Sequence, residues 1–157
     1  MYDREKAVAY ARKWALGRNP DFMDFQTMGG DCTSFVSQCL YAGCGEMNLT
    51  PVYGWYFRSA RDRTASWSGV KYLYQFLIGN RGAGPRAVEV PETELIPGDV
   101  IQLGRQDGTY YHSLFVVEAG RPAARDNILI CAHTDDSLDR PLDTYFIEQM
   151  RCLHIQQ

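Results

Sequence analysis

The apolar residues in the first half of the chain recur at the spacing of amphipathic helices. They fall three and four positions apart in residues 3–17, 32–43 and 68–79, which is the period of one helix face. Asp3 stands where a helix cap is expected, and Gly43 follows the second run where a left-handed residue commonly closes a helix. The pattern therefore predicts three helices.

Shorter apolar runs in the second half are typical of strands. They cover residues 87–90, 100–103, 110–118, 127–134 and 150–155. Residues 50–67 show no period and are expected to be irregular, and residues 141–149 are expected to hold a helical turn. Helices followed by a run of antiparallel strands predict an α+β fold, with N-terminal helices packed on an antiparallel sheet. We expect one domain, residues 1–157.

Composition and charge narrow the class of protein. The 157 residues are 45% apolar and 22% charged, with a net charge of −3 and no basic stripe, so we expect no nucleic-acid partner. The apolar runs are too short to span a bilayer. The charged first residues do not resemble a signal peptide, so we expect a protein that is either not exported or exported as part of a longer protein. We expect a monomer. The sequence leaves the compartment open.

Cysteine and histidine are the residues that suggest chemistry. There are five cysteines and three histidines, with no CxxC pair and no spacing typical of a zinc site, so we expect no metal and no cofactor. Cys32 follows Gly29, Gly30 and Asp31 at the start of the second predicted helix. A helix N-terminus favours a thiolate over a thiol, which predicts a nucleophile at Cys32. Cys39 lies on the same face and is expected to be a buried apolar residue.

A nucleophilic cysteine needs a base, and the base needs a group that orients it. His112 opens a predicted strand and shares a face with Leu114 and Val116, so we expect it to be the base. His133 ends the next strand, and a hairpin would bring it beside His112 as the orienting group. Asp135 and Asp136 are alternatives for that role, although Asp-Asp-Ser is ordinary turn chemistry. His154 has no evident partner.

Other polar and aromatic residues are weaker candidates for the site. The backbone N–H of Cys32 is the expected oxyanion donor, and Asp31 is expected to cap the helix, with contact to a substrate amine as the alternative. The candidates for substrate-binding walls are Trp55, Tyr56, Tyr110 and Tyr111, although ordinary packing explains each of them better when it is judged singly.

The motifs AVAYARKWALGRNPDF, GGDCTSFVSQCLYAGC, PGDVIQL, HSLFVV and AHTDD resemble those of the bacterial putative amidase domain family, which is related to the NlpC/P60 and CHAP cysteine peptidases. The resemblance covers most of the chain. It implies a papain-like (NlpC/P60-like) fold with Cys32 as nucleophile, His112 as general base and His133 as orienting residue. Gln26, six residues before Cys32, stands where papain-like peptidases keep an oxyanion-stabilising glutamine.

The function that follows is thiol-dependent hydrolysis of amide bonds, and the resemblance implies a peptide or peptidoglycan substrate of the cell wall. Two alternatives remain. The same acyl-enzyme could transfer its acyl group to an amine or a hydroxyl, which would make an acyltransferase. A catalytically silent cell-wall binding module could also keep this fold, but it would have no use for the set Cys32, His112 and His133.

Overall fold

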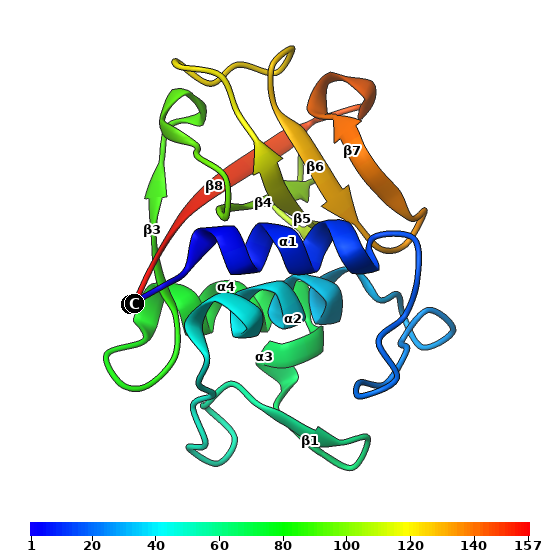
Figure 1. The fold of residues 1–157 in the computed structure, drawn as a ribbon, viewed down its shortest axis with the longest axis vertical. Coiled ribbons are helices and arrows are strands. Elements are labelled where there is room, and N and C mark those ends of the chain that lie inside the picture. The colour runs from blue at the N-terminus through cyan, green and yellow to red at the C-terminus, as the bar shows by residue number, and fades with distance from the viewer.

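Helices fill the first half of the chain in the computed structural model, which describes residues 1–157 (Figure 1). They are α1 (Arg4–Trp14), α2 (Cys32–Cys44), α3 (Ala65–Ser68) and α4 (Val70–Gly79). The side chain of Asp3 accepts a hydrogen bond from the N–H of Lys6, which confirms the predicted cap of the first helix. No helix is long and apolar enough to cross a membrane.

The second half forms one six-stranded antiparallel sheet. Its strands are β3 (Arg86–Val90), β4 (Val100–Gly104), β5 (Tyr110–Glu118), β6 (Leu129–Ala132), β7 (Ser137–Pro141) and β8 (Gln149–Gln156). Their order across the sheet is β3-β8-β4-β5-β6-β7, and every neighbouring pair is antiparallel. The expected α+β class with antiparallel strands is therefore confirmed. A short helical turn at Leu142–Thr144 also agrees with the sequence pattern.

Both faces of the sheet are buried, each against a different layer. Phe115 and Val117 of β5 join the core that α1, α2 and α4 contribute to. Leu114 and Val116 of the same strand join a second core on the opposite face, with residues from loops and from Leu142. Strand side chains alternate between faces, so even and odd positions of β5 belong to different cores.

The two chain ends lie close together. In Figure 1 the start of α1 and the end of β8 meet at one side of the molecule. The Arg4 guanidinium donates to the carbonyl of Ile155 at 2.6 Å and to the carboxylate of Asp99 at 2.8 Å. Asp99 also accepts from the N–H of Ile155. These contacts join the first helix to a strand near the middle of the sheet.

The closure of α2 differs from the sequence prediction. Gly45, with φ of 73°, is the left-handed cap, and its N–H donates to the carbonyl of Tyr41. Gly43 lies inside the helix, where a Cβ would stand 2.5 Å from the ring of Tyr2. Its lack of a side chain therefore serves the packing of the N-terminal segment rather than a turn.

Three local predictions also need correction. Strand β6 ends at Ala132, so His133 lies in the turn after it. The following residues form β7, a strand at the edge of the sheet that the apolar pattern did not indicate. The segment expected to be irregular contains α3 and a small hairpin of β1 (Phe57–Ser59) and β2 (Asp62–Arg63).

Candidate functional site

The chain enters α2 through two glycines in left-handed conformations. Gly29 and Gly30 have φ of 95° and 105°, which residues with side chains rarely adopt. A Cβ on Gly30 would stand 2.9 Å from the hydroxyl of Thr134. That hydroxyl accepts a hydrogen bond from the N–H of Asp31 at 3.1 Å. The glycine pair therefore lets the β6–β7 turn hold the segment immediately before Cys32.

Cys32 lies at the first turn of α2 and is almost fully buried, at 7% exposure. Burial raises the pKa of the thiol. The N–H of Ser113 and the hydroxyl and N–H of Thr33 contact the sulfur and favour the thiolate, but less than burial disfavours it. The expected thiolate is therefore not the resting form: the free protein holds a thiol, with donors in place for the thiolate.

A chain of polar side chains extends behind the sulfur. The Thr33 hydroxyl lies 3.7 Å from the Cys32 sulfur and 3.0 Å from the hydroxyl of Ser113. The amide nitrogen of Gln102, on β4 directly opposite Ser113, donates to the Ser113 hydroxyl at 3.2 Å. Arg151 of β8 in turn donates twice to the amide oxygen of Gln102, at 2.8 and 2.6 Å. This Cys32–Arg151 chain crosses three neighbouring strands.

Sequence reasoning missed the members of this chain beyond Cys32. A signal was present, because Gln102 interrupts the apolar run VIQL and is fully buried. A buried amide requires hydrogen-bond partners, so such a residue indicates a polar network.

A pocket of about 370 Å³ opens beside Cys32. Its apolar walls include Phe25, Met28 and Tyr111, and Gly29, Gly30 and Gly69 leave room for an extended ligand. Cys32 and Thr33 also line it. The nucleophile candidate thus faces a cavity large enough for part of a peptide.

His112 lies on β5, next to the residue whose N–H contacts the sulfur. Its side chain is 8% exposed and forms no hydrogen bond in the structure, with either Cys32 or any other residue. Burial lowers its pKa to about 4; the nearby Arg140 adds to the decrease and Asp135 opposes it. The imidazole is therefore neutral at neutral pH and free to accept a proton.

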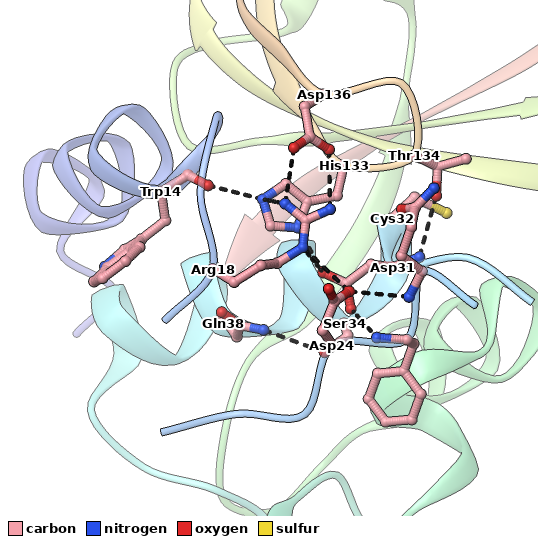
Figure 2. A network of polar contacts seen from close by, with 12 residues as sticks. Trp14, Arg18, Asp24, Asp31, Cys32, Ser34, Gln38, His133, Thr134 and Asp136 are labelled. Atoms are coloured by element: carbon pink, nitrogen blue, oxygen red, sulfur yellow. Dashed lines mark hydrogen bonds and ion pairs between the residues drawn. The ribbon is translucent and has the colours of Figure 1, made fainter. Parts of the chain in front are cut away.

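His133 does not lie beside His112, which corrects the expected arrangement. Nδ1 of His133 lies 2.5 Å from the carboxylate of Asp31, and Nε2 lies 2.8 Å from the carbonyl of Trp14 (Figure 2). The ring stacks on Phe35, in the core below the helices. His112 shares its strand face with Leu114, in the opposite core, so the two imidazoles are on different sides of the sheet.

Asp31 does not cap the helix, which is a second correction. No side-chain capping bond is present at α2. The fully buried carboxylate instead accepts from the N–H of Phe25 at 2.8 Å and contacts His133. A buried carboxylate with these partners is not available to a substrate amine. Figure 2 shows the Cys32 sulfur outside this network.

The two aspartates of the β6–β7 turn occupy different surroundings. Asp136 pairs with Arg18 at 2.8 Å, on the His133 side. Asp135 pairs with Arg140 at 3.4 Å, and its charge raises the pKa of His112. Of the three candidates for the orienting group, only Asp135 acts on His112, and it does so without a hydrogen bond.

The remaining candidates are only partly gathered at the pocket. Tyr111 lines it, but Tyr56 and Tyr110 do not, and the Arg151 guanidinium lies over the Tyr110 ring. Trp55 is fully buried against Trp67 and donates to the hydroxyl of Ser37, so it belongs to the core. Gln26 is exposed, and its side chain forms no hydrogen bond and does not line the pocket.

The His154 ring is half-buried and contacts the carboxylate of Asp99 at 3.2 Å, which gives it a structural partner. No group of three or more His, Cys, Asp or Glu side chains is placed to hold a metal ion.

The fold and site define an α+β protein with a buried cysteine at a helix start, facing an open pocket, and a neutral histidine on the adjacent strand whose side chain lies on the other face of the sheet. The chain belongs to the family described as "Putative amidase domain", whose model matches residues 1–155. The description of the family refers to amide hydrolysis. The uncharacterized protein YhbB of Bacillus subtilis strain 168 is 39% identical over 121 residues, which are 74% of this chain and 37% of that protein. The chain thus spans little more than a third of that relative, and no solved structure matches it.

Proposed function

We propose that this chain is a papain-like thiol amidase, a single domain over residues 1–157 that hydrolyses amide bonds in peptides of the bacterial cell wall. The observation that carries the proposal is the setting of Cys32. Its sulfur sits at a helix start, lines a pocket and faces the N–H groups of Ser113 and Thr33. A cysteine kept only for packing, such as the fully buried Cys39, has no pocket before it.

In this proposal His112 acts as a general base rather than as part of a resting ion pair. Burial raises the pKa of the Cys32 thiol and lowers that of His112, so both groups are neutral in the free protein. His112 takes the thiol proton as the sulfur attacks the substrate carbonyl carbon. No contact joins the two side chains in the free protein, so this proposal requires the His112 imidazole to move toward Cys32 when substrate binds.

The remaining steps use the same groups. The negative charge that develops on the carbonyl oxygen is stabilised by the backbone N–H of Cys32 at the start of α2. The protonated His112 then gives its proton to the leaving amine, which breaks the C–N bond and leaves a thioester. Water, deprotonated by His112, attacks the thioester and releases the acid and the thiol.

The test is incubation with purified peptidoglycan fragments, followed by mass analysis of the products. Cys32→Ala is expected to abolish cleavage and to leave the midpoint of thermal unfolding nearly unchanged, because Cys32 borders a cavity. Cys39→Ala is the matched control: it should keep the activity and lower the free energy of unfolding by about 1 kcal/mol through lost burial. A Cys32→Ala protein with wild-type turnover would overturn the proposal.

A further inference from the structure

Arg63 brings the only formal charge to the wall of the pocket beside Cys32. The other residues around the cavity are apolar, glycine, serine, threonine or cysteine, apart from the tyrosine at position 111. No carboxylate lines the cavity, and that of Asp31, next to Cys32 in the chain, is buried and turned toward His133 and Phe25. A ligand in this pocket therefore meets a positive charge without a compensating negative one.

The Arg63 guanidinium is held in place but not neutralised. Its Nε donates to the carbonyl of Ala60 at 3.1 Å, and Nη1 donates to the hydroxyl of Ser68 at 3.2 Å. The guanidinium lies 4.6 Å from the centre of the Phe25 ring, on the pocket wall. No ion pair of the structure includes Arg63. Nη2 keeps its two N–H groups free, in a side chain whose geometry suits a carboxylate.

A neighbouring arginine of the same hairpin shows the usual alternative. Arg58 is more than half exposed and pairs with Asp62 at 3.7 Å. Arg63 comes directly after that aspartate but projects to the pocket side, where Ser68 and Phe25 fix it. Helix α4 also begins at this wall, and no side chain caps its N-terminus, so its first backbone N–H groups add to the positive potential.

We propose that Arg63 determines substrate specificity by binding a free carboxylate next to the scissile amide, so that the substrates are acidic peptides. This inference rests on the proposed function, because it needs the scissile carbonyl at Cys32. The carboxylate accepts from Nη2 of Arg63, while the glycines at the pocket rim accommodate the peptide backbone. Arg63 thus selects the substrate by its charge, and Cys32 attacks the amide next to the bound carboxylate.

The test compares two alkylating reagents that differ only in charge. Iodoacetate carries a carboxylate where iodoacetamide carries a carboxamide, and in both the sulfur bonds to the CH₂ carbon of the reagent, with loss of iodide and of the thiol proton. Peptide mass analysis gives the rates at Cys32 and at Cys44, which lies at the far end of α2 and serves as an internal reference. The measured quantity is the iodoacetate-to-iodoacetamide rate ratio at Cys32 divided by that at Cys44.

We expect Arg63→Met to lower this normalised ratio about threefold or more, and Arg63→Lys to keep most of it. Arg58→Met removes the same charge from the same hairpin outside the pocket and should leave the ratio unchanged. Added salt should reduce the wild-type preference. If Cys32 reacts with both reagents but the ratio does not depend on Arg63, the inference fails and the proposed function stands. If Cys32 reacts with neither reagent, both fail.

Discussion

Asp31 and Cys32 are neighbours in sequence, but their side chains serve opposite sides of the α2 start. The sulfur faces the pocket, whereas the carboxylate faces the network of His133, Arg18 and Phe25. Arg18 also reaches the carboxylates of Asp24 and Asp136. Cys32 thus supplies the candidate nucleophile, and Asp31 fixes the backbone segment that positions Cys32.

His133→Ala should therefore lower stability first and activity only as a consequence. The buried ring contacts Asp31 and the carbonyl of Trp14, and its removal leaves the Asp31 carboxylate with too few partners. We expect the free energy of unfolding to fall by about 3 kcal/mol, measured by urea denaturation. Asp135→Asn, in the same turn, is the control and should change it by less than about 1 kcal/mol. Equal effects of the two substitutions would contradict this role of His133.

His112 should make stability depend on pH. Its folded-state pKa of about 4 lies below the ordinary value of 6.5, so the unfolded chain binds a proton between these limits and the native protein does not. This part of the stability is present above pH 6.5 and is lost as pH falls toward 4, by up to about 3 kcal/mol. Urea denaturation at pH 7.5, 5.5 and 4.5 measures it.

The control for this pH effect is His112→Gln, which has no titrating group. Its stability should decrease less than that of the wild type over the same pH range, and the difference isolates His112. Parallel pH profiles for the two proteins would show that the pKa of His112 is not lowered in the folded protein.

At the scale of elements, β4 connects the nucleophile to the rest of the sheet through Gln102. The Gln102 amide donates to the Ser113 hydroxyl and to the carbonyl of Val70 at the start of α4, and it accepts from Arg151 on β8. One side chain thus fixes β5, β8 and the pocket wall relative to one another.

Gln102→Leu should remove these links while keeping the volume of the side chain. The Ser113 hydroxyl and the Arg151 guanidinium would lose a buried partner, at a cost of about 2 kcal/mol in the free energy of unfolding. We also expect a changed rate of iodoacetamide reaction at Cys32, because Ser113 contacts both Thr33 and the sulfur. Gln106→Leu, at an exposed turn, is the control. A Gln102→Leu protein with wild-type stability and thiol reactivity would show that the polar contacts from Cys32 to Arg151 have no structural role.

The sequence predicted what depends on local pattern. The start of α2 at Cys32 follows from the Gly-Gly entrance and from the apolar spacing after it, and β5 has the predicted bounds because YYHSLFVVE is a continuous strand run. The pairing of His112 with His133 was wrong because it depends on register. In the structure Phe115 pairs with Cys131, so the pairing that would bring the two histidines to one face does not occur.

Other features could not be predicted because they depend on residues far apart in the chain. Strand β8 was expected, but its place between β3 and β4 is decided by pairing with strands that lie far before it in the chain. Gln102 and Arg151 meet only because of that placement. Arg63 lies in a segment without apolar period, and its place on the pocket wall depends on contacts with Phe25 and Ser68 that the fold brings together.

At the scale of the whole molecule, the Asp99 carboxylate joins the two ends of the chain. It is fully buried and accepts from Arg4 of α1, from the N–H of Ile155 in β8 and from the N–H of Ile96 in its own turn. Figure 1 shows α1 and β8 meeting where the two termini lie. The helix layer and the sheet are thus connected at a point remote from the β6–β7 turn that holds Asp31.

Asp99→Ala should destabilise the whole domain rather than one layer. It leaves the Arg4 guanidinium and two backbone N–H groups without their acceptor, and we expect a loss of about 3–5 kcal/mol in the free energy of unfolding. The exposed Asp126→Ala is the control.

Tryptophan fluorescence reports on the helix-side core, through Trp55 and Trp67, and thiol reactivity of Cys152 reports on the opposite core. Because both cores are built on the same six strands, the two signals should change at the same urea concentration in the wild type and in Asp99→Ala. Separate midpoints would mean that the two faces of the sheet unfold independently, and that Asp99 connects the chain ends without coupling the two cores.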